Sequence, residues 1–203
     1  MDRLGAAGMV QRSFSHAIAE GDGISVVAAV EDADSARSAE AQRAEALVVT
    51  GDPAAVRDAT SLPILWRGEI PFELASSAAD AVMIVFDGLD DDDGRLEQLH
   101  QRAVELGLDV AVEVRDEEEL EQALDRVDPD IFLLSPVDKE DDESPLDVVL
   151  DLLANVPAGK LAIADLPVTT PYEVQELERA GCDAVIVHAR DLSPLVGGPP
   201  PEV

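Results

Sequence analysis

Glu113 is the residue whose type and position point most clearly to chemistry. It lies near the end of residues 109–114, which have the apolar composition of a buried strand, and Asp116 just beyond is placed to cap a new helix. Glu119, three residues further on, completes the pattern of a capping box. Chemistry in parallel α/β proteins collects at the carboxyl ends of strands, so Glu113 is a candidate for acid–base work or ligand binding. The alternative is an ion pair with Arg67, because an unpaired buried carboxylate is costly.

Two more polar residues follow predicted strands later in the chain. Asp165 comes directly after the apolar residues 161–164, and His188 comes directly after residues 184–187. With Glu113 they could converge on a divalent metal, but no motif gives them ligand spacing, and we predict no metal site. His188 is interpreted as a hydrogen-bonded structural residue or as a ligand-binding residue rather than a general base.

Lys139 lies in the loop after the predicted strand 131–134, on the same face as Glu113. It is a candidate for ligand binding. Its neighbours include Asp138 and the acidic run 140–143, which raise the pKa of a lysine and keep it protonated. That environment favours a solvated surface lysine over a catalytic one.

The elements that position these residues alternate between strand and helix. Cap-and-proline pairs such as Asp52-Pro53 and Thr170-Pro171 begin several of the helices. The predicted strands are residues 25–31, 46–50, 63–67, 81–86, 109–114, 131–134, 161–164 and 184–187. This alternation predicts a parallel sheet, and eight repeats predict a single closed (β/α)8 TIM barrel. The alternative is an open doubly wound sheet. No glycine-rich phosphate loop follows the first predicted strand, so this alternative has no support from a nucleotide-binding motif.

The two ends of the chain lie outside this repeat. Residues 1–24 form a predicted N-terminal extension with one amphipathic helix over about residues 7–19, and residues 25–192 form the barrel. The tail, residues 193–203, is rich in proline and glycine, so the last helix of the barrel is expected to be short or missing. The apolar outer face of the last and first strands then needs a cover, either the N-terminal helix or a second copy of the chain in a homo-oligomer.

The chain is strongly acidic, with 44 acidic and 14 basic residues and a net charge of −30. Repulsion among so many negative charges destabilises a protein at low salt, and multimolar salt screens this repulsion. The composition therefore indicates a halophilic protein rather than one whose acidic surface binds a single basic partner. No basic stripe is present, which disfavours nucleic acid. No apolar run reaches the length of a membrane span and no signal pattern opens the chain, so we expect a cytoplasmic protein that does not bind membranes. The single cysteine, Cys182, is expected to be structural.

One segment resembles a known family. Residues 106–120, Leu-Gly-Leu-Asp-Val-Ala-Val-Glu-Val-Arg-Asp-Glu-Glu-Glu-Leu, closely resemble the fifth-strand segment of indole-3-glycerol-phosphate synthases. Weaker similarities run in the same order along residues 53–65, 79–83, 170–174 and 181–187. The resemblance implies a lyase of tryptophan biosynthesis that closes an indole ring by decarboxylating and dehydrating a carboxyphenylamino-deoxyribulose phosphate. It implies a small anionic ligand, and we predict no cofactor.

The family's catalytic residues are only partly retained in this sequence. The strand-five glutamate matches Glu113, but the strand-three lysine matches Arg67, and the strand-one glutamate-x-lysine pair falls on Ala29 and Glu31. The strand-seven glutamate falls on Asp165. Arginine cannot release a proton near neutral pH, although it can clamp a carboxylate.

The family's remaining site positions also differ. The strand-six asparagine falls near Leu134 or Ser135, and the strand-seven serine falls on Leu166. In the family, glycine-containing loops after strands seven and eight hold the phosphate. In this sequence, the two glycine positions fall on Pro167, which lacks an N–H, and on His188.

These differences predict a divergent barrel that is a pseudoenzyme without synthase activity. We expect it to bind a small ligand through His188, Glu31 and Lys139, or to act through protein contacts. One alternative is an active synthase that uses Glu113, Arg67 and Asp165. A second is an unrelated enzyme activity at the same end of the barrel.

Overall fold

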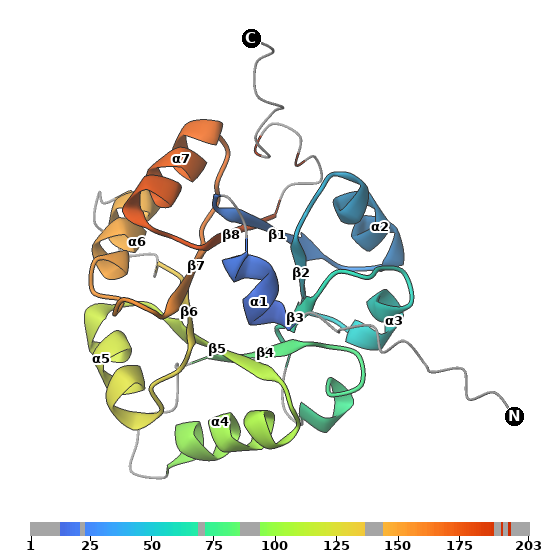
Figure 1. The fold of residues 1–203 in the computed structure, drawn as a ribbon, viewed down its shortest axis with the longest axis horizontal. Helices are drawn as coiled ribbons and strands as arrows, with labels where there is room; N and C mark the ends of the chain where they lie inside the picture. The colour runs from blue at the N-terminus through green and yellow to red at the C-terminus, as the bar shows by residue number, and fades with distance from the viewer. Residues whose placement is uncertain are drawn as a thin grey trace, which may run out of the picture.

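The computed structural model describes residues 13–20, 23–68, 72–85, 94–136 and 144–188, together with Leu192 and Leu195. Its core is a closed barrel of parallel strands in sequential order (Figure 1). The strands are β1 (Ser25–Val30), β2 (Ala46–Val49), β3 (Ile64–Trp66), β4 (Ala81–Val85), β5 (Asp109–Val114), β6 (Ile131–Leu134), β7 (Leu161–Asp165) and β8 (Ala184–Val187). β8 pairs with β1, which closes the barrel and rules out the open sheet. The prediction of a single (β/α)8 barrel is confirmed.

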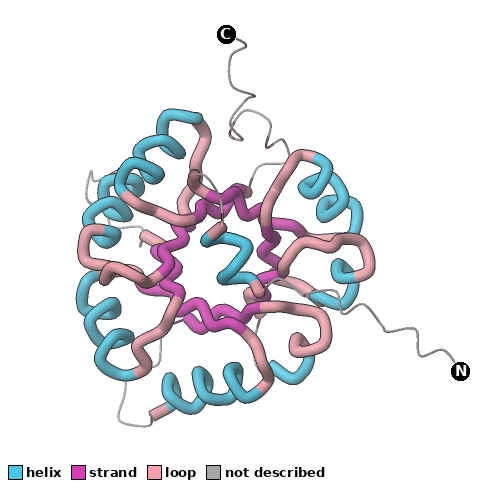
Figure 2. Tube along the Cα trace, viewed as in Figure 1, coloured by secondary structure: helices cyan, strands magenta, loops and turns pink. Residues whose placement is uncertain are grey.

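Helices surround the ring of strands on its outside (Figure 2). They are α2 (Ala33–Ala41), α3 (Pro53–Arg57), α4 (Arg95–Glu105), α5 (Glu117–Arg126), α6 (Pro145–Leu153) and α7 (Pro171–Ala180). Pro71, which follows the third predicted strand, predicts the start of a helix like those at Pro53 and Pro171, and this prediction was wrong in kind. Pro71 itself lies outside the described residues, and the three residues after it form one 3-10 turn, η1 (Phe72–Leu74).

Alternation along each strand separates an inner and an outer apolar layer. In β5, Ala111 joins the inner layer, whereas Val110, Val112 and Val114 pack in the outer layer against the helices. Trp66 also belongs to the outer layer, and its indole N–H donates to the Gly51 carbonyl at 2.9 Å.

The predicted helix caps are partly confirmed. Thr170 and Glu173 form a complete capping box at the start of α7. Asp116 accepts from the Glu119 N–H at 2.9 Å, as predicted, but Glu119 does not close a box on Asp116. Its carboxylate instead accepts from the Arg115 N–H at 2.8 Å and pairs with the Arg115 guanidinium at 2.7 Å. The neighbouring positive charge explains this difference, because charge-assisted hydrogen bonds are the stronger ones.

The N-terminal helix α1 (Phe14–Ala19) lies inside the ring of strands (Figure 1). Its buried Phe14 and Ile18 belong to the inner layer of the barrel. The Ser15 N–H donates to the Asp109 carboxylate at 2.8 Å, and the Ser25 hydroxyl donates to the Ile18 carbonyl at 3.2 Å. Asp109 and Ser25 begin their strands, so α1 closes the amino end of the barrel. The alternative in which this helix covers the outer face of β8 and β1 was therefore wrong.

The outer face of β8 and β1 is buried by the chain itself. Val26, Val185 and Val187 are at most 5% exposed, and Leu192 and Leu195 join the same outer layer. The Leu192 N–H donates to the Gln42 side-chain oxygen at 2.7 Å, which places Leu192 beside the end of α2. A second copy of the chain is not needed to bury these residues, and the homo-oligomer stays a prediction. In the described part of the chain, no helix has the length and apolar character to cross a membrane.

Candidate functional site

The mouth of the barrel, at the carboxyl ends of the strands, gathers the charged side chains that the sequence singled out. Glu113 and Asp165 occupy inward-facing positions at the ends of β5 and β7. Arg67 and His188 follow β3 and β8 at positions with the same inward parity. Ion pairs and hydrogen bonds join these four side chains into one network.

Arg67 lies between the two carboxylates of the network. One of its terminal nitrogens pairs with Asp165 Oδ2 and lies 3.6 Å from Glu113 Oε1. Its Nε contacts the sulfur of Met83 at 3.2 Å. The Arg67 side chain is 24% exposed, and those of Glu113 and Asp165 are 12% and 8% exposed. The guanidinium thus serves as the shared counter-charge of two mostly buried acids.

Glu113 is held in a poorly solvated position. Burial raises the pKa of its carboxyl group, and the charge of Arg67 and a hydrogen bond from Ser135 oppose that shift. The ion pair between Glu113 and Arg67, which the sequence analysis gave as an alternative, is present. Arg67 lies farther from Glu113 than from Asp165. Glu113 is therefore engaged with protein groups on two sides.

His188 completes the network at its solvent side. Its Nε2 lies 2.8 Å from Asp165 Oδ1, while about half of the side chain is exposed. Asp165 therefore divides its two oxygens between Arg67 and His188. This hydrogen bond fixes the orientation of the imidazole ring at the mouth, as an oriented histidine in an acid–base site requires.

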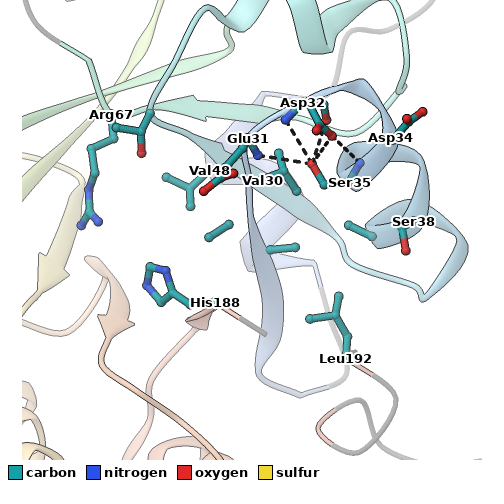
Figure 3. A pocket seen from close by; sticks show the side chains of 14 residues that line it. Val30, Glu31, Asp32, Asp34, Ser35, Ser38, Val48, Arg67, His188 and Leu192 are labelled. Carbon is teal, nitrogen blue, oxygen red and sulfur yellow. Dashed lines mark hydrogen bonds between the residues drawn. The ribbon is translucent and has the colours of Figure 1, made fainter. Parts of the chain in front are cut away.

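A cavity of about 550 Å³ opens beside the network. It runs from the mouth over the end of β1 to the start of α2 (Figure 3). In that view, Arg67 and His188 lie on one side of the cavity, and Asp32 and Ser35 of the α2 start lie on the other. Glu31, between these two sides, also lines it. Its other lining residues are Ala28, Ala29, Val30, Asp34, Ser38, Ala39, Val48, Thr50 and Leu192.

Sequence reasoning named four of these lining residues, Ala29, Glu31, Arg67 and His188. It missed the wall made by α2, although Asp32 followed by Ser35 at the end of a predicted strand is a recognisable helix-start pattern. It also missed Leu192, because no local pattern shows that a residue after the last strand lies beside α2. Lys139 lies outside the described residues, and its predicted role stays a prediction.

Backbone N–H groups near the mouth are already bonded by the protein's own side chains. At the start of α7, the Glu173 carboxylate accepts from the N–H groups of Thr169 at 2.9 Å and Thr170 at 2.8 Å. At the start of α2, Asp32 accepts from the Ser35 N–H at 2.8 Å, and the Ser35 hydroxyl accepts from the Asp32 N–H at 3.1 Å. Such groups are the usual donors to a bound phosphate.

No metal centre is evident in the same region. Among the residues that the structure describes, no three histidine, cysteine or acidic side chains come together in a way that could hold a metal ion. Arg67 lies between Glu113 and Asp165, where its positive charge opposes a cation.

A closed parallel barrel with its charged side chains gathered at the carboxyl ends of the strands defines a TIM-barrel protein. The family model for indole-3-glycerol phosphate synthase matches residues 25–190, and the chain belongs to that family.

Solved structures of other barrels share the fold. The N-acetylmannosamine-6-phosphate 2-epimerase of Clostridium perfringens is 12% identical with a TM-score of 0.69, and the match covers 82% of this chain and 87% of that one. The thiamine phosphate pyrophosphorylase of Pyrococcus furiosus is 16% identical with a TM-score of 0.63, and the match covers 85% and 93%. At these identities the similarity concerns the fold alone.

Proposed function

We propose that this family member binds a small molecule at the barrel mouth and does not catalyse closure of an indole ring. The observation that carries the proposal is the pairing of Arg67 with Asp165 and Glu113. Arg67 takes the position of the family's strand-three lysine, and it stays charged in any catalytic cycle near neutral pH. The mouth therefore lacks a general acid at that position, and its retained glutamate is engaged with the guanidinium.

The arrangement of hydrogen-bond donors supports the same proposal. The family's substrate carries a phosphate, which needs N–H donors from loops after strands seven and eight. After β7 the chain offers Pro167, which has no N–H, and Thr169 and Thr170, whose N–H groups are bonded to Glu173. The same two N–H groups would have to leave Glu173 before they could hold a phosphate.

The cavity supports ligand binding rather than a purely structural barrel. Its volume of about 550 Å³ lies in the usual range for small-molecule sites. It combines apolar walls with a few oriented polar groups, as such sites do.

Phosphate binding separates this proposal from an active synthase. Isotope-labelled protein is titrated with glycerol 3-phosphate while the backbone amide signals of Thr169, Thr170 and His188 are followed by NMR, with glycerol at the same concentrations as the control. We expect no saturable shift beyond that of glycerol. Saturable shifts at these amides with the phosphate ester alone would contradict the proposal and favour the active synthase.

The His188–Asp165 hydrogen bond at 2.8 Å favours a second candidate, an enzyme of another class that moves a proton at the mouth. An extract of small metabolites incubated with the protein in heavy water tests it. Deuterium incorporated into one compound by the native protein, but not by His188→Gln, would support this candidate. Equal incorporation with both proteins, or none with either, would eliminate it.

A further inference from the structure

We propose that the cavity selects a ligand that carries a positively charged amine, and that Glu31 is the residue that gives this selectivity. The inference rests on the proposed ligand-binding function and specifies the chemical class of the ligand. It reverses the charge expected from the family, whose substrate is an anion.

The two basic side chains in the cavity wall, Arg67 and His188, are already engaged. Arg67 pairs with both Asp165 and Glu113, and His188 shares its hydrogen bond with Asp165. The single positive charge of Arg67 is shared by these two acids. An anionic ligand would have to compete with these buried carboxylates for the same guanidinium, at the cost of leaving an acid unpaired.

Two of the three acids in the cavity wall are engaged as well. Asp32 accepts from the N–H and the hydroxyl of Ser35, each at 2.8 Å, and so caps α2. Asp34 pairs with Arg37 one turn further along that helix. These carboxylates hold the helix start in place and have partners without a ligand.

Glu31 differs from the other charged residues of the cavity. It directly follows β1 and lines the cavity, with its N–H 3.3 Å from the Ser35 hydroxyl. Its carboxylate has no ion pair with any residue in the described part of the chain. Figure 3 shows the side chain extending from the end of β1 toward the side where Arg67 and His188 lie. A ligand amine placed there gains a charge-assisted hydrogen bond.

The rest of the lining indicates the shape of such a ligand. Ala28, Ala29, Val48 and Leu192 give the cavity an apolar wall, and Thr50 and Ser38 add hydroxyl groups. A compact amine with an apolar body matches this wall better than a fully polar one, because burial of apolar surface contributes to affinity. We therefore expect an amphipathic primary amine.

Three probes of similar size and different charge test the inference: 2-phenylethylamine, 2-phenylethanol and phenylacetate. Each is titrated into isotope-labelled native protein at the lowest KCl concentration at which the protein stays folded, and amide shifts of Ala29, Glu31 and His188 report binding. We expect the amine to bind most tightly and phenylacetate most weakly. Since Glu31 is solvent-exposed, Glu31→Gln should weaken amine binding about two- to fivefold and leave the alcohol unchanged.

Asp34→Asn is the matched control, because it removes the same charge from the same cavity wall at a residue that is already paired. It should leave amine binding within about twofold of the native protein. Binding of all three probes without an amine preference, or equal amine binding by Glu31→Gln, would overturn the inference and leave the ligand site intact. Absence of shifts with every probe at millimolar concentration would overturn both the inference and the proposed binding function.

Discussion

Replacing Arg67 with methionine tests the network at the barrel mouth most sharply. The variant keeps the apolar stem and leaves Glu113 and Asp165, 12% and 8% exposed, without their shared counter-charge. Breaking a fully buried pair costs about 3–5 kcal/mol, and the 24% exposure of the Arg67 side chain reduces this to an expected loss of about 2–3 kcal/mol at neutral pH. The free energy of unfolding is measured with urea at constant KCl.

The pH dependence of that loss gives an independent check. Burial already raises the pKa of Glu113, and removing Arg67 takes away the largest opposing influence, so the pKa rises further. A raised carboxyl pKa means that stability is fully present below the unfolded-state pKa and is lost as pH rises through the folded-state pKa. The difference between Arg67→Met and the native protein should therefore shrink on acidification.

A matched control is Arg37→Met, which breaks the exposed pair with Asp34 and should change stability by less than about 0.5 kcal/mol. An Arg67→Met variant as stable as the native protein at neutral pH, or one whose deficit grows on acidification, would refute the reasoning.

Three further predictions concern the rest of the molecule. Phe14→Ala should lower the free energy of unfolding by about 3 kcal/mol, because fully buried Phe14 fills the amino end of the barrel; a loss below about 1 kcal/mol would contradict this placement. Cys182, whose pKa burial raises to about 12, should react with a thiol reagent only after unfolding in urea; rapid labelling of native protein would contradict this. With a net charge of −30, the urea midpoint should rise steadily with KCl, and a midpoint independent of KCl would exclude the proposed halophilic adaptation.

The fold was predictable from sequence because each unit carries the same local signals. The strand limits of β5, β6 and β8 agree with those predicted, since an apolar run bounded by turn residues defines them on both sides. Gly107, just after the end of α4, carries a recognisable helix-stop signal, and its φ of 75° is a conformation that glycine adopts without strain. The place of α1 inside the barrel was not predictable, because an amphipathic stripe shows that a helix packs but not which surface it meets.

The candidate site was predictable to the level of single residues but not of their partners. Strand parity brought Glu113 and Arg67 to the same end of the barrel and allowed their ion pair. That Asp165 takes the shorter contact with Arg67 and also binds His188 depends on side-chain geometry across four strands, which no linear pattern records. The roles of these residues in binding or catalysis stay predictions.

Turnover of the family's substrate is the measurement that decides most directly between a binding barrel and a synthase. The purified native protein is mixed in multimolar KCl with carboxyphenylamino-deoxyribulose phosphate, with the protein in molar excess over this substrate. The amount of indoleglycerol phosphate formed is measured, and the Glu113→Gln variant is the control. We predict no product from a protein shown to be folded under the same conditions. Product that forms with the native protein and disappears with Glu113→Gln would contradict the proposed function and show that Arg67 can stand in for a catalytic lysine.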